Sequence, residues 1–156
     1  MRWSSAVSDI SSLTRAVDDT AEQVEIGLDG PSADLVFAFI SSHHAPSYYS
    51  VVELVRSRFP GAIVIGCSAG GVIGAGHEVE KTPGVALTAA SLPGVVITPF
   101  EFEKEELPNP DASPDAWEAL IGVPASDHPS IVLLPDPFTL PSEALVEGLD
   151  YAYPDS

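Results

Sequence analysis

Two short apolar runs, separated by a segment with a different pattern, restrict the fold of this chain more than any other feature. Residues 35–40 and 62–65 are continuously apolar, which is typical of strands that are buried on both faces. Between them, residues 47–59 carry apolar side chains at helical spacing, and Pro60-Gly61 ends that pattern. Strand, helix and strand in this order predict a βαβ unit with two neighbouring parallel strands. We therefore expect an α/β fold.

The flanking segments predict a mixed β-sheet with helices against it. Residues 2–7 are expected to form a short strand, and the apolar stripe from Ile10 to Leu28 predicts a helix that ends near Gly27 or Gly30. After the βαβ unit, three β-prone runs predict an antiparallel meander, with a tight turn at Pro93-Gly94 between the last two. These runs are residues 71–76, 85–92 and 95–102.

The last third of the chain contains an acidic, proline-rich loop at residues 101–115. Ser113 and Pro114 have the residue types of an N-cap and a first helical position. Residues 131–134 are expected to form another buried strand, and residues 141–149 a final helix. A length of 156 residues fits one domain with one core.

Composition excludes several classes of function. Six basic residues against 23 acidic ones give a formal charge of −17, which repels the phosphates of nucleic acids and anionic membrane surfaces. The acidic residues lack the spacing of a calcium loop, so we expect no metal, and no dinucleotide fingerprint supports a nucleotide cofactor. Cys67 is the single cysteine, has apolar flanks and is expected to be buried and unreactive. No signal peptide or membrane-spanning run is evident, which favours the cytoplasm.

The most specific local pattern is a glycine-rich segment that follows a predicted strand. Its residues match G-x-S-x-G and are Gly66, Cys67, Ser68, Ala69 and Gly70, followed by Gly71. In serine hydrolases this pattern exposes a nucleophile at a strand-to-helix turn, but residues 71–76 are a poor helix start. Two other interpretations stay open: tight backbone packing, and a concave site whose backbone N–H groups bind a carboxylate or a similar group.

Four polar residues outside this segment are further candidates for ligand binding. His43 and His44 follow a predicted strand, and since adjacent side chains diverge, one of them is expected to face a pocket. Asp136 follows the last predicted strand, where capping of its own loop is the alternative. Glu78 is either a pocket residue or part of a solvated strand edge.

We expect these candidates to meet at one edge of the sheet. In open α/β sheets a ligand crevice lies outside the carboxyl ends of the strands. The segments expected to form it are residues 41–44, 66–71 and 135–138.

Three segments together resemble the N-terminal FIST domain, named for F-box and intracellular signal transduction proteins. They are residues 1–8, residues 36–44 with their Ser-His-His, and residues 60–74 with the glycine-rich strand end. The resemblance implies a sensory input module that binds a small ligand, such as an amino acid, and that has no established catalytic residue. It also implies a C-terminal FIST region as a partner.

Residues 150–156 offer no strand after the last predicted helix, so we expect the fold to be incomplete without that region or another signalling domain. An open sheet edge or apolar face is then expected, which favours self-association as a homo-oligomer. Two other functions stay open. One is a serine hydrolase that uses Ser68, and the other is a scaffold that docks a partner protein and binds no ligand.

The hydrolase hypothesis is tested by Ser68→Ala. Because we assign the hydroxyl at most a hydrogen bond, ester hydrolysis by the variant should equal the background measured with the parent chain. A loss of genuine turnover of about 10³-fold or more, the scale of a missing nucleophile, would instead support the hydrolase. Covalent labelling by an active-site serine probe supplies a second readout.

Overall fold

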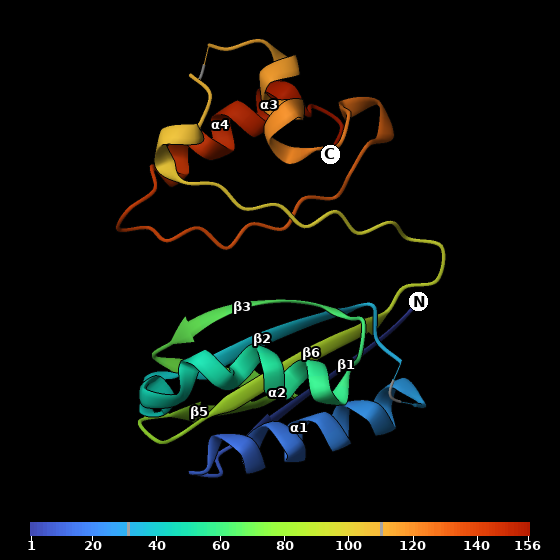
Figure 1. The fold of residues 1–156 in the computed structure, drawn as a ribbon, viewed down its shortest axis with the longest axis vertical. Coiled ribbons are helices and arrows are strands. Elements are labelled where there is room, and N and C mark those ends of the chain that lie inside the picture. Colours follow the sequence, from blue (N-terminus) through green and yellow to red (C-terminus); the bar gives the residue numbers. More distant parts are fainter. Residues whose placement is uncertain (31, 110) are drawn as a thin grey trace. The chain divides into compact units, whose positions relative to one another are not determined.

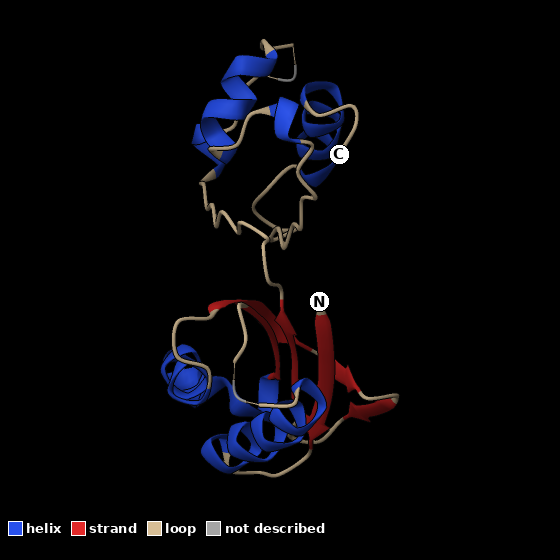
Figure 2. Ribbon diagram, turned by 90° about the vertical axis from the view of Figure 1, so that its right-hand side faces the viewer, coloured by secondary structure: helices blue, strands red, loops and turns tan. Residues whose placement is uncertain are grey.

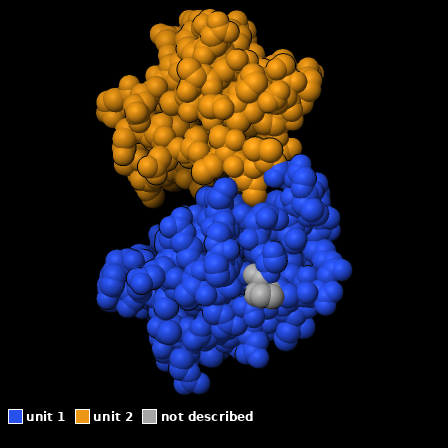
Figure 3. Space-filling model, turned by 45° about the vertical axis from the view of Figure 1, so that its right-hand side comes forward, with its two compact units in different colours: residues 1–95 blue, residues 96–156 orange. Residues whose placement is uncertain are grey.

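The structure is a computed structural model that describes residues 1–30, 32–109 and 111–156. Its contacts divide the chain into two compact units, Met1–Val95 and Val96–Ser156, which are described separately (Figure 3). The α/β fold with a mixed sheet and flanking helices is confirmed. That residues 1–156 act as one domain stays a prediction.

Unit 1 contains a four-stranded mixed sheet and a two-stranded hairpin. Its elements, in chain order, are β1 (Arg2–Ser8), α1 (Leu13–Leu28), β2 (Leu35–Ser41), the 3-10 helix η1 (Ser42–Ser50), α2 (Val51–Arg58), β3 (Ile63–Ala69), β4 (Gly71–Gly74), β5 (His77–Glu80) and β6 (Val85–Ser91). The strand order in the larger sheet is β1-β6-β2-β3.

The predicted βαβ unit is confirmed. β2 and β3 are parallel neighbours, in register from Leu35 opposite Ile63 to Ser41 opposite Ala69. β6 lies between β1 and β2 and is antiparallel to both. β1 and β2 therefore run in the same direction, and their C-terminal ends lie at the same end of the sheet.

The core of unit 1 lies between the sheet and its two helices. α1 and α2 cover the same face of the sheet (Figures 1 and 2). Alternate residues of β6 reach this core, because side chains alternate between the faces of a strand. They are Val85, Leu87 and Ala89, and each is fully buried. Burial of such apolar surface supplies the main driving force for folding.

The end of α1 follows the expected chemistry. Asp29 adopts a left-handed conformation with φ of 65°, and the N–H of Gly30 donates to the carbonyl of Glu25 at 2.9 Å. These features form a Schellman-type C-cap, which satisfies carbonyls that the helix end leaves open. The helix thus ends at Leu28, between the two predicted glycines.

The helix predicted at residues 47–59 is shorter than expected. Only Val51–Arg58 is α-helical, and the preceding residues form η1. The hydroxyl of Ser50 donates to the carbonyl of Ser47 at 2.8 Å, and such local side-chain bonds compete with the α-helical ladder. Residues 41–44, which were expected to border a crevice beyond the strand, form no open loop, since Ser41 ends β2 and η1 begins at the next residue.

The predicted meander is only partly present. β4 and β5 form an antiparallel hairpin, in register from Gly71 opposite Glu80 to Gly74 opposite His77. β6, however, pairs with β1 and β2 rather than with β5, and residues 95–102 form no strand. Pro93-Gly94 therefore does not join two strands. An apolar run such as β6 gains more by entering the middle of a sheet, where both faces are buried, than by extending a small hairpin.

Unit 2 is built around two helices and their own apolar cluster. Its elements are η2 (Lys104–Glu106), α3 (Pro114–Ile121), η3 (Ala125–Asp127) and α4 (Ser142–Ala152). Ser113 is the N-cap of α3 and Pro114 its first residue, as predicted. The cluster includes Trp117, and Gly148 of α4 packs so closely against this indole that a Cβ atom would collide with it.

The strand predicted at residues 131–134 is absent from unit 2. Ile131 and Leu133 pack against the apolar cluster, while Val132 and Leu134 are exposed. The alternation of an extended segment is present, but no neighbouring strand supplies the ladder of hydrogen bonds that a sheet requires.

Two glycines of the G-x-S-x-G segment differ in what surrounds them. A Cβ atom on Gly66 would collide with the carbonyl oxygen of Ala38 on β2, whereas one on Gly70 would meet no atom within 4 Å. Gly66→Ala should therefore lower the melting temperature by several degrees, the shift that about 1–2 kcal/mol produces in a small domain. Gly70→Ala is the matched control and should melt within about 1 °C of the parent in calorimetry. Equal melting of both variants would contradict this account of the strand pair.

Candidate functional site

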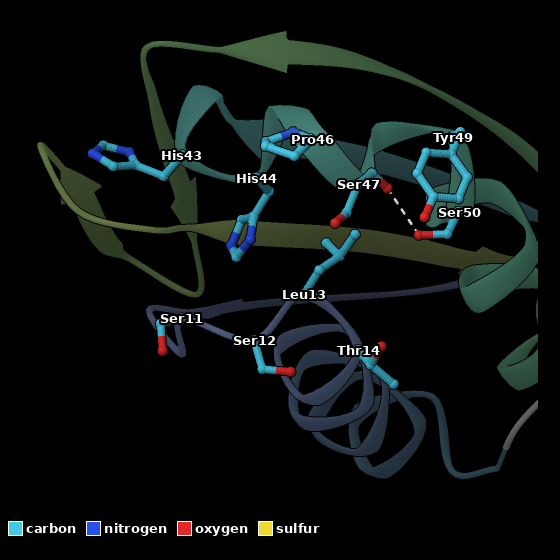
Figure 4. Close-up of a pocket in the computed structure, with 10 residues that line it drawn as sticks. All are labelled: Ser11, Ser12, Leu13, Thr14, His43, His44, Pro46, Ser47, Tyr49 and Ser50. Carbon is cyan, nitrogen blue, oxygen red and sulfur yellow. Dashed lines mark hydrogen bonds between the residues drawn. The ribbon is translucent and has the colours of Figure 1, made fainter.

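Unit 1 has a pocket of about 430 Å³ beside the N-terminal end of α1 (Figure 4). One wall comes from η1 and the other from the first residues of α1 and the segment before it. The lining residues are Ser11, Ser12, Leu13, Thr14, His43, His44, Pro46, Ser47, Tyr49 and Ser50. The parallel direction of β1 and β2 explains this meeting, because both segments leave the sheet at the same end.

His44 is the one lining side chain that is both polar and nearly fully buried among the described residues, with 4% of its surface exposed. Its ring lies between η1 and the start of α1 (Figure 4). Within the described part of the chain, its Nε2 atom has no hydrogen-bond partner. Burial, and to a lesser extent neighbouring His43, lowers the pKa of His44, so a neutral imidazole is favoured near pH 7.

The start of α1 also presents unpaired polar groups. Ser12 has the extended backbone of an N-cap, with φ of −84° and ψ of 117°, yet its side chain makes no capping hydrogen bond. A helix leaves its first N–H groups without intrahelical acceptors, and these normally find a cap, water or a ligand. No acidic residue occupies the first turn of α1.

The wall formed by η1 is fixed to the sheet by hydroxyl groups. Tyr48 donates its hydroxyl to the carbonyl of Ser41 at 3.1 Å. The Ser41 hydroxyl is buried and accepts the backbone N–H of Gly84 at 2.8 Å. These bonds hold the end of β2, and therefore the turn that carries His44, in one position.

Of the predicted candidates, only His43 and His44 line this pocket. Four others, Gly66, Cys67, Ser68 and Ala69, belong to β3 and lie opposite residues of β2 rather than beyond its end. Gly70 links β3 to β4, and Gly71 begins β4. Ser68 thus lies inside a strand that is followed by another strand, unlike a nucleophile at a strand-to-helix turn. Ligand binding by this segment stays a prediction.

The expectation that Cys67 is buried is wrong, because its side chain is exposed. β3 is the edge strand of the sheet, so apolar neighbours in sequence do not cover this residue on its open side. Glu78 is an exposed residue of β5. It fits the solvated strand edge that the sequence left as its alternative.

Asp136 lies in unit 2 and binds its own turn. One carboxylate oxygen accepts the N–H of Phe138 and the other the hydroxyl of Thr139, both at 3.0 Å. This is the loop-capping role that aspartate often has in turns. A joint crevice of residues 135–138 with segments of unit 1 stays a prediction.

Residues 1–30, 32–109 and 111–156 contain no group of three or more His, Cys, Asp or Glu residues placed to hold a metal ion. None of their helices has the length and apolarity needed to cross a bilayer.

Comparison with protein families gives a match to the FIST N domain over residues 34–156. The chain belongs to the FIST N domain family. It is also 26% identical over 168 aligned positions to two proteins of Mycobacterium tuberculosis, "Uncharacterized protein MT0656" of strain CDC 1551 / Oshkosh and "Uncharacterized protein Rv0628c" of strain ATCC 25618 / H37Rv. Each alignment covers 99% of this chain and 38% of the relative. No solved structure matches this FIST chain.

Sequence reasoning missed the wall of the pocket that α1 provides in this FIST domain. Ser11 and Ser12 precede an apolar stripe, and serine before such a stripe is the usual sign of a helix N-terminus. The signal was therefore present. What the pattern could not show is that this helix start faces the turn that carries His44.

Burial of His44 predicts a pH-dependent stability. The pKa of His44 is lower in the folded chain than in the unfolded chain. As the pH falls below about 6.5, the unfolded chain therefore binds a proton at this histidine first, and the free energy of unfolding decreases until the pH reaches the folded-state pKa. His44→Leu should remove this contribution, so its free energy of unfolding should fall less between about pH 7.5 and 5.5 than that of the parent. Urea unfolding at both pH values measures the difference. An identical pH dependence of the two proteins would contradict the prediction.

Proposed function

We propose that this FIST domain is a cytoplasmic sensory input module for signal transduction, that it binds a small molecule in the pocket between η1 and the start of α1, and that it catalyses no reaction. The observation that carries the proposal is the buried, unpaired Nε2 atom of His44, a residue that lines a pocket of about 430 Å³. A buried polar atom without a partner costs about 1–3 kcal/mol. A ligand that hydrogen-bonds to it would offset that cost.

The lining of the pocket suits recognition of a small polar molecule. Hydroxyl groups of serine, threonine and tyrosine can both donate and accept hydrogen bonds. Ser12, Ser47 and Tyr49 contribute such groups from both walls (Figure 4). Leu13 and Pro46 add apolar contact surface, and this mixture of apolar contact and a few polar groups is usual for small-molecule sites.

A second candidate site is the glycine-rich segment at the end of β3. Gly70 has open space around its Cα atom, so its backbone is accessible to a bound group. This agrees with the interpretation of the segment as a backbone N–H site for a carboxylate. The unpaired His44 nonetheless favours the pocket, since the glycine-rich segment has no comparable buried polar atom among the described residues.

Transmission of the signal would require a further region. The chain spans 38% of the length of the M. tuberculosis relatives that it matches. We therefore propose that a C-terminal FIST region or another signalling domain receives the signal, with self-association of this chain as the alternative. Nucleic acids and membranes are poor partners for a chain with a charge of −17.

A thermal-shift screen of a metabolite library with the 156-residue chain tests the proposal. At least one compound should raise the melting temperature in a concentration-dependent way, because a ligand that binds only the folded state stabilises it. Ser11→Trp, which places a large side chain on a wall of the pocket, should abolish that shift. Ser57→Trp is the matched control, since Ser57 is exposed on α2 and does not line the pocket.

The same screen shows whether a compound binds in the pocket or at the glycine-rich segment, and it distinguishes ligand sensing from a scaffold function. Gly70→Val should leave the shift unchanged if the pocket binds the compound, and should abolish it if the glycine-rich segment does. The absence of any shift across the library would contradict ligand sensing and favour a protein-docking scaffold.

A further inference from the structure

We infer that the pocket beside α1 is an anion site, in which the helix N-terminus and the Nε2 atom of His44 hold a carboxylate or phosphate oxygen. The inference rests on the proposed function, because it names the chemical class of the ligand for the same pocket. Three independent features of the pocket support it: the uncapped helix, the distribution of charge and the unpaired imidazole.

The helix that points its N-terminus at the pocket is long and uncapped. α1 has 16 residues, and Ser12, Leu13 and Thr14 from its start line the pocket. Among the described residues, none accepts a hydrogen bond from the backbone N–H groups of Leu13, Thr14 or Arg15. Aligned peptide dipoles give such an end a charge equivalent to about +0.5, which favours a bound anion.

The charge around the pocket is unlike that of the whole chain. The sequence has 23 acidic residues, yet none of the ten lining residues is acidic. Arg15 instead occupies the first turn of α1, where a cation opposes the helix dipole, and it makes no ion pair with any described residue. Without a carboxylate in its wall the pocket cannot neutralise a cationic ligand, whereas an anion would meet several donors.

His44 supplies a donor from the opposite wall. A neutral imidazole carries one N–H group, and the Nε2 tautomer places that group on the atom that has no hydrogen-bond partner among the described residues. His44 exposes 4% of its surface, and an anion that binds Nε2 displaces part of the side-chain packing that covers this atom. An oxyanion between the α1 N–H groups and Nε2 would pair both walls at once. Hydrogen bonds to a charged acceptor are about twice as strong as neutral ones.

The test is a titration of the 156-residue chain with inorganic phosphate and, separately, with acetate, followed by nuclear magnetic resonance. Ionic strength and pH are held constant, and chloride replaces the anion in the control. We expect the largest shifts at the backbone amides of Leu13, Thr14 and Arg15 and at the His44 ring. The relative affinity for the two probes distinguishes a phosphate ligand from a carboxylate ligand.

Two matched pairs of variants identify the donors. Thr14→Asp places a carboxylate in the first turn and should bind the anion about tenfold or more weakly than the neutral variant Thr14→Asn, which has a side chain of nearly the same size. His44→Leu removes the donor and should weaken binding about tenfold, the effect of one charge-assisted hydrogen bond. His44→Gln keeps a side-chain N–H group and should restore most of the affinity.

The outcomes separate this inference from the proposed function. If a library compound binds in a manner that Ser11→Trp abolishes, but neither anion shifts the start of α1, the inference is wrong and ligand sensing stands. Equal anion binding by Thr14→Asp and Thr14→Asn would also overturn it. If neither anion nor any library compound binds, both proposals fail.

Discussion

The placement of β6 between β1 and β2 is the constraint on which the rest of unit 1 depends. Its residues alternate between two buried faces, so the strand would expose apolar surface at any edge of the sheet. With β6 antiparallel to both neighbours, β1 and β2 must run in the same direction. The segments that follow them then emerge together, and the start of α1 meets η1. The pocket is therefore a consequence of strand order rather than of any local motif.

This origin explains why the pocket combines two kinds of unsatisfied group. A helix start and a turn that emerge side by side each carry polar atoms, and among the described residues neither of these two elements supplies a hydrogen-bond partner to the other. At the C-terminal end of α1 the chain itself supplies hydrogen-bond partners: the guanidinium of Arg2 donates to the carbonyl of Leu28 and to the carboxylate of Asp29. The two ends of this helix therefore differ: other side chains of the chain satisfy its C-terminal end, whereas none of the described residues caps its N-terminal end.

Patterns that depend on neighbours in sequence predicted much of this fold. The apolar runs identified β2 and β3, and Ser113-Pro114 identified the start of α3. Features that depend on distant partners were not predictable: β6 was assigned to a meander because its sequence does not reveal which strands flank it. Cys67 was expected to be buried for the same reason, since the open side of an edge strand is not visible in the residues next to it. Of the candidate site, the two histidines were foreseen and the helix wall was not.

Gly148 and Trp117 show how one contact limits sequence change in unit 2. The indole occupies the volume that any side chain at position 148 would need, so the two helices approach one another across a bare backbone. Neither residue can then be replaced alone. A side chain at position 148 of α4 requires a smaller side chain in place of Trp117 on α3, and a smaller side chain at position 117 alone leaves a void. Residues 117 and 148 are therefore expected to change together, because only paired substitutions would preserve the spacing between α3 and α4.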